Sequence, residues 1–242
     1  MTFTAGAERR HGAAAQVFVD DLTAPQLDDL DAHHLLRVRR LRDGEVVIAA
    51  DGTGAWRSCR LVSDALSPDG PVEVEPVEEA SLCVAFAPVK GDRSEWAVAK
   101  LTELGCDRIV ALATERAAVR WRGPAAGRAL ERWARIAREA ACQSRRVRLP
   151  LVEGPLEVAR FLDDPSAAMA VPGAAPLSPS STTVLIGPEG GWSEAELALG
   201  IPAVGLAQNV LRTETAAVAA AVLTGAIRAG TVAHVERNGS PG

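Results

Sequence analysis

The stretch 182–218 constrains the fold most, because it holds two strand-loop-helix passages in direct succession. Each passage opens with a short apolar run, 184–186 in the first and 203–206 in the second, which is typical of a buried strand. A loop and then a predicted helix follow each run. In a parallel sheet such loops lie at the carboxyl ends of the strands, where ligands bind. The stretch therefore predicts an α/β fold in which two loops hold a ligand.

The first loop, 187–191, reads Gly-Pro-Glu-Gly-Gly. It leads into a helix for which Ser193 is the expected N-cap, with Glu196 at the capping-box spacing. Glycines at this place let a ligand approach the backbone, whose unpaired N–H groups can donate to it. The alternative is a plain turn that needs glycine for a positive φ, and the glycines alone favour that turn. The spacing matches neither GxGxxG nor the GxxxxGK phosphate loop, which argues against both of those nucleotide sites.

The second loop, 207–212, ends at Arg212 and enters a helix through Thr213 and Glu214. This helix carries alanine and valine on nearly all sides and extends to about residue 228. A helix of that composition is usually buried, and its small side chains allow another backbone or another subunit to approach closely. If the two strands of the stretch are neighbours, Arg212 and Glu214 lie beside the first loop.

The remaining elements fall into two groups. Residues 16–62 predict a small β-barrel, with strands at 16–19, 46–49 and 55–61 and a helical turn at 31–41. A linker rich in Pro, Gly and Glu follows at 67–80, where Val72 and Val74 add an edge strand. From residue 82 onward, expected strands at 82–87, 108–113, 149–152 and 168–171 alternate with expected helices at 93–104, 125–143 and 156–162. This alternation predicts a mostly parallel sheet, and the expected domains are residues 1–75 and 76–242.

The charges are distributed unevenly along the chain, which bears on whether the protein binds a nucleic acid. A net charge of −5 argues by itself against a nucleic-acid partner, but residues 82–150 carry 14 basic and 7 acidic side chains. Such a basic segment in an acidic protein is typical of a local surface that binds a polyanion. The helix at 125–143 contributes a stripe of Arg128, Arg132 and Arg135. An arginine-rich, solvated helix surface explains the charge equally well.

Cysteine and histidine patterns indicate no metal site. The four cysteines, Cys59, Cys83, Cys106 and Cys142, show no CxxC spacing, so we expect buried, reduced thiols. The four histidines form no HExxH or similar pattern. No apolar run is long enough to span a bilayer and no hydrophobic signal region opens the chain, so we expect a cytoplasmic protein.

Several of these segments together resemble one family. The run IGPEGG before a capped helix, and the later LRTETA, resemble the paired signature of SPOUT methyltransferases, specifically the bacterial family that methylates N3 of a uridine in 16S ribosomal RNA. Residues 33–54, 90–116 and 132–146 resemble the same family, so the likeness covers nearly the whole chain. It implies a PUA-like RNA-binding β-barrel over 1–75 and a SPOUT domain with a C-terminal trefoil knot over 76–242. It also implies a homodimer and S-adenosylmethionine as methyl donor.

The resemblance assigns cofactor-binding residues to both loops. These are Ile186, Gly187, Gly190, Gly191, Leu206, Val210, Leu211 and Thr213. The family usually has Gly and Arg where this chain has Ala207 and Asn209, a departure that concerns either the affinity for the cofactor or a contact with RNA.

Methyl transfer to uracil N3 needs loss of a weakly acidic proton and an unpaired base. We expect Arg212 to stabilise negative charge on the uracil oxygens, and Glu189 or Glu214 to accept the proton. Capping of a helix N-terminus is an equally good explanation for each carboxylate. The expected RNA-binding residues are Arg37, Arg39, Arg40, Lys90, Arg93, Arg145 and Arg146, followed by the stripe on the long helix. Trp56, Trp121 and Trp192 are candidates for stacking on bases, whereas Trp133 fits core packing or a dimer contact.

Two other functions compete with uracil methylation. Ribose 2′-O methylation is common among related knotted enzymes, although the barrel and residues 90–93 favour the base as the acceptor. A non-catalytic RNA-binding or ribosome-assembly protein is the alternative from a different class, and it draws support from Ala207 and Asn209.

Overall fold

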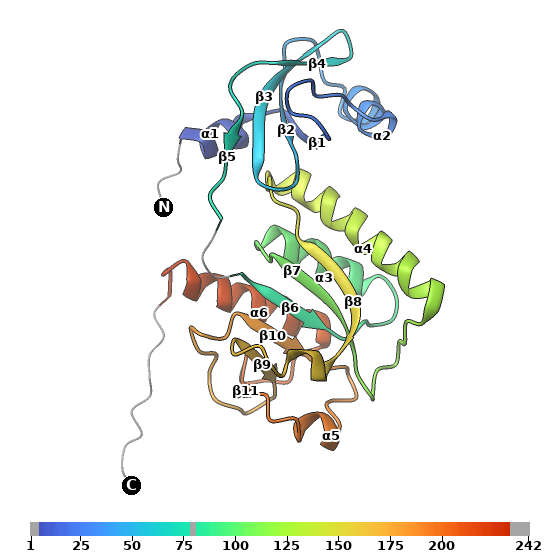
Figure 1. Ribbon diagram of the computed structural model, residues 1–242, viewed down its shortest axis with the longest axis vertical. Helices are drawn as coiled ribbons and strands as arrows, with labels where there is room; N and C mark the ends of the chain where they lie inside the picture. The colour runs from blue at the N-terminus through green and yellow to red at the C-terminus, as the bar shows by residue number, and fades with distance from the viewer. Residues whose placement is uncertain (1–4, 78–80, 233–242) are drawn as a thin grey trace. The chain divides into compact units, whose positions relative to one another are not determined.

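The computed structural model describes residues 5–77 and 81–232 (Figure 1). Contacts divide the chain into two compact units, Met1–Glu78 with Ala137–Leu149, and Glu79–Ile136 with Pro150–Gly242. The break near residue 78 lies in the expected linker. The sequence did not indicate that residues 137–149, at the end of the long helix, pack with the first unit.

A five-stranded sheet forms the first unit. Its strands are β1 (Ala15–Phe18), β2 (Val46–Ala50), β3 (Ala55–Val62), β4 (Ala65–Pro68) and β5 (Glu73–Val74). Strand β1 pairs with β2 in parallel and all other pairs are antiparallel. The helical segments are α1 (Ala5–Gly12), α2 (Asp29–His33) and the π-helix η1 (His34–Val38). Strand β4 and helix α1 were not expected, and β4 occupies the start of the segment taken for a linker.

Six parallel strands form the sheet of the second unit, in the order β11-β9-β10-β6-β7-β8. Their bounds are β6 (Cys83–Phe86), β7 (Arg108–Ala113), β8 (Leu151–Glu157), β9 (Ala167–Ala170), β10 (Thr183–Ile186) and β11 (Ala203–Val204). The parallel sheet agrees with the alternation in the sequence. The two strands of the stretch 182–218 are not neighbours, because β9 lies between β10 and β11 and pairs with both. Alanines make most of β9, and all of its side chains are buried or nearly so.

The helices of this part of the chain are α3 (Arg93–Glu103), α4 (Gly123–Ser144), the 3-10 helix η2 (Val158–Phe161), α5 (Glu194–Leu197) and α6 (Thr213–Arg228). Helix α6 packs against α3 and against strands β6 and β10 (Figure 1). The expected helix at 156–162 is largely wrong, because Leu156 and Glu157 complete β8 and only the short η2 follows. Asp92 precedes α3 but its side chain does not cap it, whereas Gly105, with φ +85°, does follow the helix end.

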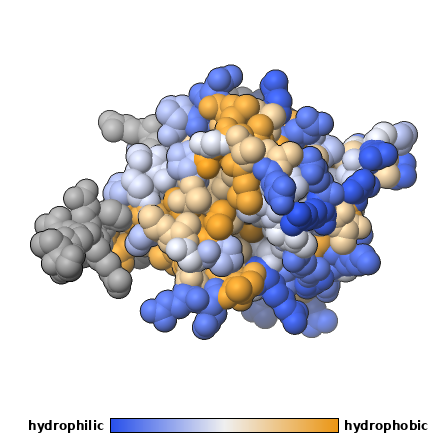
Figure 2. All heavy atoms as spheres, turned by 90° about the horizontal axis from the view of Figure 1, so that it is seen from below, coloured by the Kyte–Doolittle hydropathy of each residue, from blue (hydrophilic) through white to orange (hydrophobic). Residues whose placement is uncertain are grey.

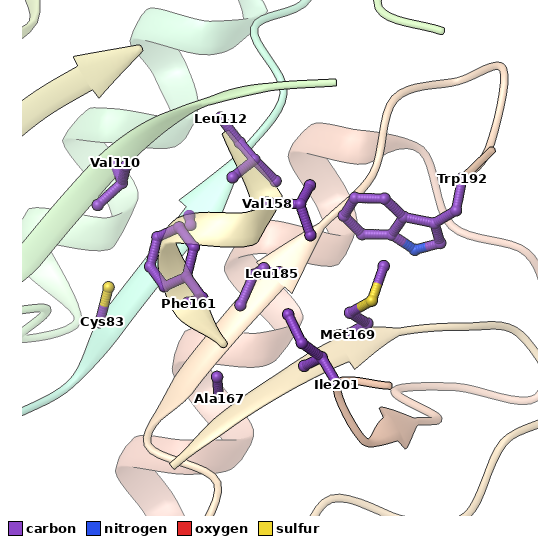
Figure 3. Packing of buried hydrophobic residues seen from close by; sticks show 11 residues of the cluster. Cys83, Val110, Leu112, Val158, Phe161, Ala167, Met169, Leu185, Trp192 and Ile201 are labelled. Carbon is purple, nitrogen blue, oxygen red and sulfur yellow. The ribbon is translucent and has the colours of Figure 1, made fainter. Parts of the chain in front are cut away.

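Aromatic side chains join helix α4 to the parallel sheet. The ring of Trp133 stacks on Phe86 of β6 with centroids 4.8 Å apart, and Trp121 meets it edge-on at the same separation. Trp133 is 2% exposed, which agrees with the prediction that it belongs to the core. A second cluster of buried residues includes Met169 of β9, Leu185 of β10 and Trp192 of the loop after β10 (Figure 3).

Apolar residues also reach the surface. Val210 is 81% exposed and Leu197 is 48% exposed. Figure 2 shows one face on which apolar residues gather in the middle, with polar side chains around them. None of the described helices combines the length and the apolarity that crossing a membrane requires.

We expect Trp133→Ala to lower the thermal midpoint by about 10 °C, because it removes a buried indole together with its stack on Phe86. Trp133→Phe keeps an aromatic ring at this place and should lose less. Calorimetry of the two variants measures the difference. Equal midpoints for wild type and Trp133→Ala would contradict this account of the core.

Candidate active site

Three loops that follow β9, β10 and β11 meet at the carboxyl edge of the parallel sheet. They enclose a cavity of about 170 Å³, called here the loop cavity. It is lined by Ala170, Val171, Pro172, Ile186, Gly187, Pro188, Glu189, Gly191, Trp192, Leu206, Ala207, Asn209, Val210, Leu211, Thr213 and Ala216. The two loops expected to share a ligand are therefore brought together, although their strands are not neighbours.

Glycines of the first loop serve different purposes. A Cβ on Gly187 would lie 2.9 Å from Cε2 of Trp192, so only glycine lets the indole pack there. The indole is held in place, since its Nε1–H donates to the Ala170 carbonyl at 2.9 Å. Gly191 has φ +71° and nothing within 4 Å of a Cβ, which means that the backbone conformation requires glycine there. Gly190 lies outside the lining and packs against Arg116.

The predicted capping box at the start of α5 is confirmed. The Ser193 hydroxyl accepts from the Glu196 N–H at 3.1 Å, and Oε2 of Glu196 accepts from the Ser193 N–H at 2.8 Å. The other oxygen of Glu196, Oε1, accepts from the Glu115 N–H at 3.0 Å. This buried carboxylate thus fixes the end of the first loop and the segment that follows β7 at the same time.

The second loop contributes the aliphatic side chains of Leu206, Val210 and Leu211 to the cavity. A hydrogen bond joins it to the first loop, since the Thr213 hydroxyl donates to the Gly187 carbonyl at 3.0 Å. Ala207 and Asn209, the two departures from the family pattern, both lie in the lining. Both are therefore in a position to contact a ligand in the cavity.

Arg93 connects the two carboxylates expected to accept a proton. Its Nη1 donates to Oε1 of Glu189 at 2.9 Å and to Oε1 of Glu214 at 3.3 Å. These hydrogen bonds, first that of Glu189 and then that of Glu214, raise the pKa of Arg93 above its ordinary value. Glu189 is exposed and lines the loop cavity, whereas Glu214 is buried in the first turn of α6. Oε2 of Glu214 has no hydrogen-bond partner among the described residues.

This geometry gives Arg93 a role within the protein. The sequence suggested it as an RNA-binding residue, but the structure pairs its guanidinium with two carboxylates. Binding to phosphate remains a prediction for Arg93, and a phosphate would have to compete with both partners.

Arg212 occupies the N-cap position of α6, with its side chain exposed. It lies outside the cavity lining, but its chain neighbours Leu211 and Thr213 are both part of it. Within the described part of the chain, no ion pair of Arg212 is found. Its guanidinium is therefore available beside the cavity.

The residues expected to bind RNA are distributed over both units. Arg37, Arg39, Arg40, Arg145 and Arg146 belong to the first unit, and Lys90, which is exposed, belongs to the second. Arg39 and Arg145 donate to the carbonyls of Ala14 and Ala13 at 2.9 and 2.7 Å, so the backbone holds both guanidinium groups in place. Burial, and then the nearby charge of Arg39, lower the pKa of Arg145.

The other members of this set differ in their surroundings. Arg37 and Arg40 are exposed, and Arg40 has φ +56°. The backbone carbonyl of Arg146 accepts from the Gln16 amide at 2.7 Å. On the long helix, Arg132 forms an ion pair with Glu95 at 2.8 Å. Arg128 is exposed, and Arg135 has contacts of its own.

Tryptophans can stack on bases only where their rings are accessible. Trp56 is 3% exposed and Trp192 is 8% exposed, so both belong to the interior and the suggestion that they stack on bases is wrong. Trp121 is half-buried and remains a candidate. The sequence did not indicate that residues 170–172 and Trp192 line the loop cavity, because nothing local shows that β9 lies beside β10.

Neither a metal site nor a reactive thiol is found in the described ranges 5–77 and 81–232. No group of three or more His, Cys, Asp or Glu in these ranges is arranged to hold a metal ion. All four cysteines are free thiols. Burial raises the pKa of Cys59 to about 11, and that of Cys83 and Cys142 to about 12, so these thiols stay protonated at neutral pH.

Comparison with known protein families connects this geometry to an activity. A family described as "RNA methyltransferase domain" matches residues 76–225, and one described as "RNA methyltransferase PUA domain" matches residues 27–65. A protein of Mycobacterium bovis named ribosomal RNA small subunit methyltransferase E is 34% identical, over an alignment of 227 positions that covers 83% of this chain and 84% of the relative. A Bacillus subtilis protein of the same name is 28% identical over 83% of this chain and 92% of its own.

Solved structures agree with these relatives. The ribosomal RNA small subunit methyltransferase E of Neisseria gonorrhoeae, bound to S-adenosylmethionine, has a TM-score of 0.74 and 27% identity over 86% of this chain and 95% of its own. A Legionella pneumophila methyltransferase with the same cofactor has a TM-score of 0.73 and 25% identity over 89% of this chain and 97% of its own. The fold class expected from the sequence, a PUA-like barrel and a SPOUT-type knotted domain, is confirmed by these likenesses.

We expect Gly187→Ala to weaken the binding of S-adenosylmethionine about 10-fold, roughly 1.4 kcal/mol, because the added methyl group pushes the Trp192 indole into the loop cavity. Calorimetric titration of the full chain measures this change. Gly127→Ala is the matched control, since a Cβ there meets nothing within 4 Å. A Gly187→Ala variant that binds as tightly as Gly127→Ala would show that the indole does not shape the cofactor site.

Proposed function

Because the chain belongs to the ribosomal RNA small subunit methyltransferase E family, we propose that it transfers the methyl group of S-adenosylmethionine to N3 of a uridine in 16S ribosomal RNA. The observation that carries the proposal is the loop cavity, where two loops tied by the Thr213–Gly187 hydrogen bond present aliphatic side chains and bare backbone. Relatives with the same overall fold bind S-adenosylmethionine.

The residues of the loop cavity fit the methyl donor. Leu206, Val210 and Leu211 offer the apolar surface that an adenine ring needs, and Val210 is 81% exposed. At Gly191 a side chain would find nothing within 4 Å, so a ligand can approach the backbone there. When bound, S-adenosylmethionine supplies an electrophilic methyl group. The protein then has to place the acceptor and remove its proton.

Arg212 and Glu189 are the residues best placed for that work. Loss of the N3 proton leaves negative charge on the uracil oxygens, and a guanidinium beside the cavity stabilises it. Glu189 is the better proton acceptor of the two carboxylates, because it lines the cavity while Glu214 is buried outside the lining. Glu214 instead anchors Arg93, which in turn holds the Glu189 carboxylate. The Glu189 carboxylate is thereby kept at the edge of the cavity.

Binding of the RNA and the assembly of the protein follow from other surfaces. Arg39 and Arg145, held by neighbouring backbone carbonyls, support RNA binding by the first unit.

On the second unit, Trp96 of α3 and Val222 of α6 are 49% and 46% exposed, and their helices pack together. This apolar face supports a homodimer, which light scattering of the pure protein would detect. Small-subunit ribosomal RNA as the partner supports a location in the cytoplasm.

A protein that binds RNA without turnover is the second candidate. Its support is that Ala207 and Asn209, where the chain departs from the family pattern, both lie in the loop cavity. This candidate predicts no calorimetric signal with S-adenosylmethionine.

We expect ribosomal RNA from cells that lack this protein to contain no N3-methyluridine at the target position. Mass spectrometry of the digested RNA also separates the alternatives, because fragmentation shows whether the methyl group is on the base or on the ribose. Cells that carry the wild-type gene on a plasmid are the control. An unchanged N3-methyluridine content in the deletion strain excludes the proposed reaction.

Two arginines near the carboxylates should behave differently when replaced. We expect Arg212→Ala to lower kcat about 100-fold, with the thermal midpoint unchanged, because its guanidinium has no described ion pair to lose. Arg93→Ala should lower the midpoint by roughly 5 °C, since it leaves the buried Glu214 carboxylate without its partner. Turnover assays and calorimetry measure both effects. A normal kcat in Arg212→Ala assigns charge stabilisation to another residue.

A further inference from the structure

A second cavity of about 570 Å³ lies in the same unit, at the carboxyl ends of β7 and β8. We call it the β7–β8 cavity. Its walls come from the segment 114–122 that follows β7, from the end of β8 with η2, and from α5. Neither the proposed reaction nor the expected cofactor residues account for it.

The side chains on its walls form a mixed aromatic and cationic surface. Trp121 lines the cavity, half-buried, and its ring rests edge-on against the buried Trp133. Arg120 donates to the Glu115 carbonyl at 2.7 Å, which shapes the segment, while Arg122 is exposed at the rim. The backbone of this segment is held by the Glu196 carboxylate. The surface is therefore positioned by the fold before any ligand arrives.

Thr114 is a buried polar residue beside this cavity. It is 8% exposed, and its hydroxyl oxygen has almost no accessible surface and no hydrogen-bond partner among the described residues. Buried polar atoms in native proteins are nearly always paired, but a ligand reaches this oxygen only if the wall of the cavity shifts, so the cavity is judged by Trp121 and Arg122.

We propose that the β7–β8 cavity binds a nucleotide of the substrate RNA next to the target uridine. Its base lies against Trp121 and its phosphate is held by Arg122. Aromatic stacking with arginine contacts is the usual way in which proteins hold unstacked nucleotides. The proposal rests on the proposed function, since it takes RNA as the substrate.

The position of the cavity favours a flanking nucleotide over the target itself. Trp192 lines the loop cavity and packs in one cluster with Leu112, Val158 and Leu199, all of which line the β7–β8 cavity. Figure 3 shows Trp192 beside Val158, within this shared wall. A base in the β7–β8 cavity is thus separated from the methyl donor by buried side chains, yet lies close enough to hold the adjoining nucleotide.

The first test uses the five tryptophans of the chain as reporters. The full-length protein is first saturated with S-adenosylhomocysteine, so that the loop cavity is filled. Cytidine 5′-monophosphate is then titrated into it, and NMR follows the indole N–H signals. The Trp121→Phe variant identifies the Trp121 signal by its loss. We expect this signal to shift with the nucleotide and that of the buried Trp56, which belongs to the first unit, to stay. No shift of Trp121 at millimolar nucleotide would overturn the proposal.

The second test compares two variants that each remove one positive charge. Arg122→Ala should weaken the binding of cytidine monophosphate and raise KM for the RNA at least 5-fold, with the Kd for S-adenosylmethionine unchanged. Lys100→Ala, on α3 and outside both cavities, should leave all three values unchanged. Equal behaviour of the two variants would reject the site. Because the NMR titration needs no turnover, a failure there is distinguishable from a failure of the proposed reaction, which appears as unchanged N3-methyluridine.

Discussion

The hydrogen bond from the Thr213 hydroxyl to the Gly187 carbonyl is the contact on which the site depends most. Gly187 follows β10 and Thr213 opens α6, so this bond closes the loop cavity between two segments that the sheet does not bring together by strand pairing. Strand β9 lies between β10 and β11, and its end supplies the remaining wall. The loops then form a site because α6 packs on β10 and holds the second loop over the first.

Electrostatics at the cavity follow from the same packing. Helix α6 buries Glu214 in its first turn, where the positive end of the helix dipole favours a carboxylate. Arg93, at the start of α3, reaches both this buried group and the exposed Glu189. Arg93 thus links the exposed Glu189 to the buried Glu214, and this ion pair fixes the position of the Glu189 carboxylate. Arg212, one residue before α6, lies beside the cavity and has no ion pair within the described residues.

Structural features that depend on residues close together in the sequence could be predicted, whereas features that depend on residues far apart in the sequence could not. Ser193 and Glu196 predicted a capping box because both partners lie within one turn. The glycines of the first loop likewise indicated bare backbone before a helix. In contrast, the ion pairs of Arg93 join residues 96 and 121 positions away, and no local pattern shows them. The strand order and the packing of residues 137–149 with the first unit depend on tertiary contacts in the same way.

Glu196 illustrates how much one side chain can restrict a sequence. Its two oxygens accept from two different backbone N–H groups, one at the start of α5 and one after β7. Glutamine, which offers a single acceptor oxygen, can satisfy one of them but turns an N–H group toward the other. Aspartate is shorter by one methylene and cannot keep both distances. A side chain inside a four-residue helix therefore ties the end of the first loop to a wall of the β7–β8 cavity, and neither substitution keeps both bonds.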